Sequence, residues 1–472
     1  MEVIPVLPLD RLIFFRNIRT RTFFIVDDQL NRHALRESLA HLIRDHWRKL
    51  GARIANSQDK DGQLVYHLPE VFPDDYELFR WSENHNPGSI DRIEIASILK
   101  TASSEGVATL LPSLDDFDSV FRPSGWPFHL QDAPNAPMLF VHLSIFADAT
   151  VIAISHPHVL GDQMGLMNIV KAWLGMLEGN PPPPMIGYME DTLPGKKPFD
   201  EYPNSEVTKK GRMRIKSRLE NVGTGLGFIP ELALNPREDK RILFLPVSLV
   251  RSLRDRQSKE LAGGNNGLPG LTNADIITAI MTKLSRLNTG NHMLSVSQTV
   301  NLRGRIPQLS SPDQRAAYVH NGLVYATSRF PFQQSLTLGD IALMNRQAIL
   351  RTLDPNLIDT LMAVAREVTR RSQKMHICEP LEKSYHVSNW SPAWRGLDFS
   401  KALDAGAKEA RGDKRLRLLV LGQGKESKFP YRFGATIMCK TDEGYWVDWA
   451  ASRKTMKAVK MYLAKDPMLE EL

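Results

Sequence analysis

Cysteine is almost absent from this chain of 472 residues, which has only Cys378 and Cys439. Two isolated cysteines cannot build a disulfide framework or a cysteine-based zinc cluster. A protein that leaves its thiols free is typical of a reducing compartment. We therefore expect a cytoplasmic protein without a metal centre.

A long uninterrupted hydrophobic run is missing as well. The amino terminus, MEVIPVLPLDRLIFF, has no basic n-region and carries an acidic residue inside its apolar stretch, unlike a secretory signal. The most apolar stretch, residues 137–155, is interrupted by Ala147, Asp148 and Ala149 and is rich in β-branched residues. This pattern favours two strands joined by a turn and predicts that no helix spans a membrane.

The charge is unbalanced, with a formal net value of +7. Such an excess fits a nucleic acid, an anionic lipid or an anionic cofactor as partner, and it also fits a merely basic enzyme. The clearest basic run, residues 209–218, contains no aromatic side chain on which a base could stack. We interpret this run as a solvated segment and expect no nucleic-acid binding.

The length predicts two lobes with a cleft between them, because single cores stop growing at about 250 to 300 residues. Amphipathic helices are expected at 30–47 and 161–179, with strands between them, so the pattern is mixed α/β. Residues 180–240 are rich in Pro, Gly, Asn and Lys and predict a crossover loop. We place an N-terminal lobe at 1–179 and a C-terminal lobe at 241–472.

The C-terminal lobe continues the alternation of helices and strands. Ser248 has the residue type of a helix N-cap. The helices expected in this lobe are 249–261, 275–287, 340–350, 356–371 and 452–465. The strands expected are 242–247, 293–305, 386–390, 416–421, 434–440 and 445–450.

Several motifs of well-known enzyme classes are missing. The sequence contains no Ser in a G-x-S-x-G elbow and no H-E-x-x-H, which argues against serine hydrolases and zinc proteases. GTGLG at 223–227 lacks the spacing and the preceding strand of a dinucleotide loop. GQGKES at 422–427 lacks the first glycine of a phosphate loop, because Leu419 stands there.

A His-x-x-x-Asp pattern occurs twice. His41 and Asp45 lie inside the first expected helix, where residues four apart are neighbours and such a pair is ordinary surface decoration. His158 and Asp162 instead follow an apolar strand and precede a helix, the position where α/β enzymes present reactive groups. Gly161 would permit a tight or left-handed turn there. A neutral imidazole at this position could take the proton of an alcohol, and a satisfied loop histidine is the alternative.

The sequence resembles the BAHD family of acyl-CoA-dependent acyltransferases, and in particular those of fungal secondary metabolism. Five segments agree with the family in order: residues 35–54, 155–165, 272–286, 299–307 with 318–322, and 387–403. The resemblance covers nearly the whole chain. It implies two chloramphenicol-acetyltransferase-like α/β lobes with a channel between them, into which acyl-CoA and an acceptor alcohol enter.

The resemblance also implies roles for particular residues. His158 would be the general base, and Asp162 would turn away to form a salt bridge with Arg303 or Arg305. Trp390, in the segment that begins with Ser388 and Asn389, would donate its indole N–H to the oxyanion.

Two positions depart from the pattern of the family. The loop at 398–402 reads Asp-Phe-Ser-Lys-Ala and has lost both glycines and the tryptophan of the family, although Asp398 is still expected to pair with an arginine. Gln163 replaces the usual glycine after Asp162, which leaves the acyl pocket undefined.

The resemblance further predicts the substrates. Acyl-CoA, with acetyl-CoA favoured, would be a co-substrate and not a permanently bound cofactor, and the acceptor would be a hydroxylated small molecule such as a terpenoid or polyketide. We expect a monomer. The candidate coenzyme A contacts are Ser248, Arg251, Arg254 and Lys259.

Two other functions remain possible from the sequence. The first is a non-catalytic binding protein that keeps the acyltransferase fold. The second is an amide-forming condensation-type enzyme, although Pro157 and Gln163 break its His-His-x-x-x-Asp-Gly signature at both ends.

Overall fold

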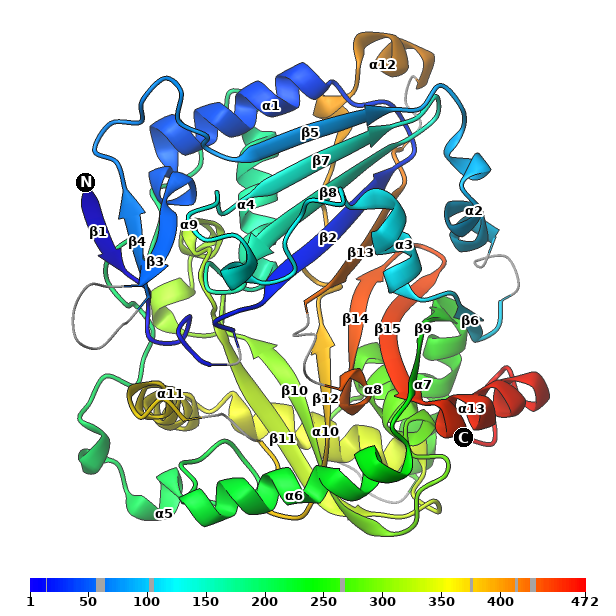
Figure 1. The fold of residues 1–472 in the computed structure, drawn as a ribbon. Helices are drawn as coiled ribbons and strands as arrows, with labels where there is room; N and C mark the ends of the chain where they lie inside the picture. Colours follow the sequence, from blue (N-terminus) through cyan, green and yellow to red (C-terminus); the bar gives the residue numbers. More distant parts are fainter. Residues whose placement is uncertain are drawn as a thin grey trace.

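The structure is a computed structural model that describes residues 1–13, 15–56, 64–101, 106–263, 268–373, 377–411, 415–424 and 430–472. In these residues the strands form three sheets (Figure 1). The five-stranded sheet has the order β13 (Leu418–Gln423), β2 (Arg19–Val26), β8 (Thr150–Pro157), β7 (Phe140–Ile145), β5 (Arg80–His85). The seven-stranded sheet has the order β11 (Leu323–Phe332), β10 (His292–Asn301), β12 (Lys383–Asn389), β14 (Gly434–Lys440), β15 (Gly444–Ser452), β9 (Glu238–Pro246), β6 (Thr109–Leu111). The small sheet has the order β1 (Glu2–Pro5), β4 (Leu64–Leu68), β3 (Arg53–Asn56).

The helices surround these sheets. Their bounds are α1 Arg32–His41, α2 Glu94–Thr101, α3 Leu114–Phe121, α4 Gln163–Met176, α5 Asn204–Val207, α6 Arg218–Leu234, α7 Val247–Ala262, α8 Asn273–Leu284, α9 Pro312–Ala317, α10 Leu338–Thr352, α11 Pro355–Arg370, α12 Ala405–Arg411 and α13 Arg453–Lys465. No helix in the described part of the chain has both the length and the hydropathy that crossing a bilayer requires.

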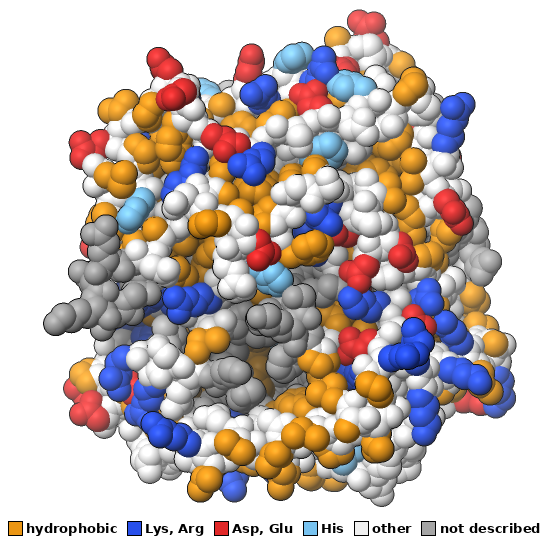
Figure 2. Space-filling model, viewed as in Figure 1, with side chains coloured by type: hydrophobic (Ala, Val, Ile, Leu, Met, Phe, Trp, Pro, Cys, Tyr) orange, Lys and Arg blue, Asp and Glu red, His pale blue; other side chains and the backbone are white. Residues whose placement is uncertain are grey.

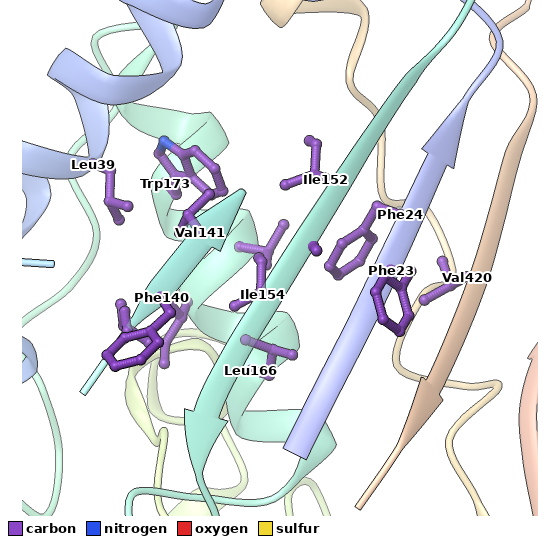
Figure 3. Packing of buried hydrophobic residues seen from close by; sticks show 14 of the residues in the cluster. Phe23, Phe24, Leu39, Phe140, Val141, Ile152, Ile154, Leu166, Trp173 and Val420 are labelled. Carbon is purple, nitrogen blue, oxygen red and sulfur yellow. The ribbon is translucent and has the colours of Figure 1, made fainter. Parts of the chain in front are cut away.

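The five-stranded sheet contains the stretch that the sequence analysis divided into two strands, and that prediction is confirmed. β7 and β8 pair antiparallel across the turn, and every residue of β8 is buried. Figure 3 shows Leu166 and Trp173 of α4 near Ile152 and Ile154 of β8. Because β8 is covered in this way, its end at Pro157 is fixed relative to the start of α4.

Each large sheet takes one strand from the other half of the sequence. β13 pairs with β2, so that Val420 lies opposite Phe24, and β6 pairs with β9, so that Leu110 lies opposite Leu243. The sequence analysis did not anticipate this exchange, because strand pairing over hundreds of residues leaves no local pattern. The two lobes are therefore interlocked.

The segment 180–240 is not a plain crossover loop, as the sequence analysis expected, because it contains the 17-residue helix α6. GTGLG lies inside this helix together with Pro230, and glycine and proline lower helix propensity, which hid it. A signal was present: the Ser217 side chain and Glu220 form a capping box. α7 likewise begins two residues earlier than expected, at Val247, with Pro246 and not Ser248 at its N-cap.

Candidate active site

A cavity of about 1960 Å³ lies between the two large sheets. Single-ligand pockets typically measure about 300 to 1,000 Å³, so this cavity has room for two substrates. β2 contributes Thr20 to its wall, β10 contributes Gln298, and β12 contributes His386. The sequence-predicted residues that line it are His158, Asp162, Arg305, Ser388, Asn389, Trp390 and Asp398.

The turn from β8 to α4 holds the His-x-x-x-Asp segment against the C-terminal lobe. A Cβ added at Gly161 would lie 1.9 Å from the carbonyl oxygen of Val319, and one added at Gly165 would lie 1.8 Å from the same atom. Of the two turns expected at Gly161, the structure has the tight one, in which the Leu160 N–H donates to the Pro157 carbonyl at 2.9 Å, and not the left-handed one, because Gly161 does not have a positive φ. The glycine is required because two backbone segments approach each other closely.

Asp162 ties this turn to the segment after β10. Its carboxylate pairs with Arg303 through distances of 3.0 Å from Nη2 to Oδ1 and 3.1 Å from Nη1 to Oδ2. The same carboxylate accepts the backbone N–H of Gly165 at 2.8 Å and that of Gly322 at 2.9 Å. Because these donors occupy both oxygens, Asp162 is a structural anchor. Arg305, the other candidate partner, instead donates to the carbonyl of Asn301 at 3.2 Å.

His158 follows the buried end of β8 and lies at the cavity wall. Its backbone N–H donates to Ile18 at 2.9 Å, and its ring stacks on Phe15 with a centroid distance of 4.1 Å. Burial lowers the pKa of the imidazole, and the Asp162 carboxylate and the Asn321 side chain oppose this effect. The neutral form is therefore favoured near neutral pH.

A buried polar chain supports the His158 backbone from behind. The Asn321 side chain donates to the His158 carbonyl at 2.9 Å and to Asp10 at 2.7 Å. Asp10 Oδ2 lies 3.0 Å from His320 Nδ1, and His320 Nε2 lies 3.2 Å from Lys49 Nζ. Burial lowers the pKa of Lys49 to about 7. No local motif marks Lys49, Asp10 or His320 in the sequence, and Lys49 and His320 are 271 positions apart, so this chain of contacts was not predicted.

Trp390 follows β12, and its indole N–H donates to the Ser388 hydroxyl at 2.9 Å. Asn389 caps the same turn, since its Oδ1 accepts the Ser391 backbone N–H at 3.1 Å. Ser388 and Trp390 thus face the cavity as a bonded pair.

His386 on β12 is a cavity residue that the sequence analysis did not single out. Its Nδ1 lies 2.9 Å from the Ser297 hydroxyl, and its Nε2 lies 3.2 Å from that of Thr299. Burial lowers the pKa of His386 to about 4, so the ring is neutral. The alternating pattern of the strand was the available signal for its inward position.

Of two expectations about charged partners, that for Asp398 is wrong and that for His41 is confirmed. Both oxygens of Asp398 accept bonds from Ser400, at 2.9 Å from its backbone N–H and 2.7 Å from its hydroxyl, and no arginine partner is found within the described ranges. The altered loop has therefore replaced the expected ion pair with a local turn. His41 and Asp45 form an exposed pair at 3.3 Å, as expected for surface decoration.

The predicted coenzyme A contacts lie on α7 and are not among the described residues that line the cavity. Ser248, Arg251 and Lys259 are exposed. Arg254 donates at 3.0 Å to Asn273, which does line the cavity. Their role stays a prediction.

Several known proteins are similar to this chain in sequence. No protein-family model matches the sequence. The chain is 27% identical over 398 residues to the acetyltransferase adrJ of Penicillium rubens, with 80% of this chain and 77% of the relative covered. It is 27% identical over 452 residues to the O-acyltransferase pboC of Aspergillus ustus, with 90% and 92% covered. It is also 24% identical over 491 residues to the transcriptional regulator calD of Penicillium decumbens, with 99% and 96% covered.

A solved structure confirms the fold. TRI101 of F. graminearum, crystallised with coenzyme A and T-2 mycotoxin, superimposes with a TM-score of 0.68 over 98% of this chain and 97% of that chain. The sequence identity is 11%, so the likeness shows a shared fold. The expected two-lobed α/β architecture is therefore confirmed.

The anchoring of Asp162 generates a stability prediction. Arg303→Met would leave a buried carboxylate without its ion-pair partner and should lower the free energy of unfolding by about 3 to 5 kcal/mol. Urea denaturation followed by fluorescence measures the change. Arg305→Met is the matched control and should cost less than about 1 kcal/mol, because Arg305 bonds to a backbone carbonyl. Equal losses in the two variants would contradict the assignment.

Proposed function

We propose that this BAHD-type acyltransferase moves an acyl group, most simply acetyl, from coenzyme A to a hydroxyl of a small natural product, with His158 as general base. The observation that supports this proposal best is the place of His158: at the wall of a cavity with room for two substrates, on a turn fixed by the Asp162–Arg303 pair. The relatives named acetyltransferase and O-acyltransferase, and the neighbour solved with coenzyme A and a mycotoxin, support the substrate classes.

The chemistry needs one base and one oxyanion donor. The neutral His158 ring takes the hydroxyl proton through Nε2 as the oxygen attacks the thioester carbonyl. The tetrahedral intermediate places its negative oxygen near Trp390, whose single N–H must leave the Ser388 hydroxyl, its acceptor in the free protein, to donate to the oxyanion. When the intermediate collapses, the carbon–sulfur bond breaks and the imidazolium returns its proton to the coenzyme A thiolate.

A non-catalytic binding protein is the rival function, and the similarity to calD is the observation that favours it. An acetyl-transfer assay distinguishes the two functions. Purified protein incubated with acetyl-CoA and a panel of hydroxylated terpenoids or polyketides should release coenzyme A and add an acetyl mass to the acceptor. Acceptor binding without any acyl transfer would favour the rival.

His158→Ala tests the base directly. The variant should lower kcat by about 10² to 10⁴ fold while thermal unfolding stays nearly unchanged, since losing a general base costs that much. His41→Ala, in the exposed second copy of the pattern, should leave the rate unchanged. A His158→Ala enzyme that keeps more than about half of the wild-type rate would refute the assignment.

The pH dependence of kcat/KM tests the state of the same ring. The base must be neutral, so activity should fall as the pH falls through the pKa of His158. Burial lowers this pKa, so the acidic inflection should lie below about 6.5, the ordinary value for histidine. Rates over pH 4 to 9 with a verified acceptor measure it, and an inflection near 8 would contradict this role.

Binding of the coenzyme A phosphates can be assigned by charge reversal. Lys401, Arg417 and Lys440 are exposed residues that line the cavity. Lys401→Glu with Arg417→Glu should raise the KM for acyl-CoA about tenfold and weaken its dependence on salt. Arg251→Glu with Lys259→Glu on α7 is the matched pair. A larger KM effect from the α7 pair would instead support the assignment made from the sequence.

A further inference from the structure

The helix α6 exposes a row of large apolar side chains. The first four of them are three and four positions apart, which places them on one face of the helix, and the fifth lies at its C-terminal end. In Figure 1 the helix runs along the lower edge of the molecule, and Figure 2 shows hydrophobic side chains gathered along the same edge. The row is Leu219, 84% exposed; Val222, 59%; Leu226, 49%; Ile229, 52%; Leu234, 79%.

The opposite face of α6 fixes this orientation. Lys383 donates to the Gly227 carbonyl at 2.9 Å, and a Cβ added at Gly227 would meet the Leu381 backbone at 3.1 Å. The Phe228 ring packs edge-on against Phe433 at 4.8 Å and lines the cavity. α6 therefore contributes Phe228 to the cavity wall, and its apolar row faces away from the cavity. Leu381, 68% exposed, extends the apolar surface beside the helix.

The charged residues of α6 and its neighbours are mostly cations on the exposed side. Within α6, every residue of which is described, the acidic residues are Glu220 and Glu231, and both pair with arginines of the protein body, Arg214 and Arg286. Neither of these carboxylates is therefore an unpaired charge. The exposed cations next to the helix in sequence are Lys209 and Lys210 before it, Arg218 at its start and Arg237 after it, and Lys209 lies 3.9 Å from the Glu206 carboxylate.

We propose that the outer face of α6 docks on the surface of an anionic phospholipid bilayer. An apolar helix face flanked by Lys and Arg is suited to the boundary between headgroups and acyl chains, where apolar burial and attraction to anionic lipid act together. This docking does not require the chain to cross the bilayer. Since a helix is about 10 Å thick, docking brings the cavity within one helix of the lipid.

A second copy of the chain fits this face less well. Paired helices use side chains beside the apolar row to interlock and to form ion pairs. Beside this row stand Gly223, Gly225 and Pro230, which offer no such groups. A lipid surface needs no interlocking side chains. The two occupants also differ in measurement, because a second copy would bind without lipid.

Vesicle sedimentation tests the proposal with the full-length protein. The protein should pellet with phosphatidylcholine vesicles that contain phosphatidylserine, and less with phosphatidylcholine alone. Leu226→Glu with Ile229→Glu should weaken this binding at least tenfold, about the effect of losing two buried apolar side chains. Both residues lie outside the proposed catalytic machinery, so acetyl transfer to a water-soluble acceptor should persist.

Two controls separate the apolar and the charge contributions. Val71→Glu with Val120→Glu adds the same two charges at exposed apolar residues outside α6 and should bind vesicles like the wild type. Lys209→Glu with Lys210→Glu should abolish the preference for phosphatidylserine. Failure of the wild type to pellet, unchanged pelleting of the α6 variant, or a wild-type dimer in light scattering that the α6 variant abolishes would each overturn the proposal.

Discussion

The buried pair of Asp162 and Arg303 is the interaction on which the site depends. Burying two charges is costly, and the cost is offset only when every oxygen and N–H finds a partner. Here the carboxylate also accepts two backbone N–H groups, and the guanidinium also donates to the carbonyls of Tyr318 and His320. The pair therefore joins the turn of one lobe to a loop of the other. The part of the cavity wall that carries His158 is therefore held in place only when the two lobes are in contact.

Burial in the protein interior also keeps several histidines neutral. Burial lowers the pKa of His156 to about 3 and that of His386 to about 4. His156 is fully buried within β8 and is not among the described residues that line the cavity, and His386, which is, has hydroxyls beside both ring nitrogens. Of these three rings, His158 is the one whose surroundings leave it suitable for a base.

The sequence made the local parts of this structure predictable and left the distant ones hidden. The strand before His158, the helix after Asp162 and the turn between β7 and β8 follow from hydrophobic period and turn residues. The partnership of Lys49, His320 and Asp10 could not be predicted, because each residue is ordinary in its own segment. α6 was hidden for another reason: its glycines and Pro230 oppose helix formation, so its stability depends on packing against residues far along the chain.

The exchange of β6 and β13 has a consequence for how the chain folds during synthesis. The five-stranded sheet lacks the strand beside β2 until residue 423 has left the ribosome. Unpaired edge strands are sites for wrong pairing, and contacts between distant residues form slowly. The N-terminal half must therefore persist with an open edge while the nearly 400 residues between β2 and β13 are synthesised. A fragment that ends between the lobes would keep that edge unpaired, so we expect the two halves to fold as one unit.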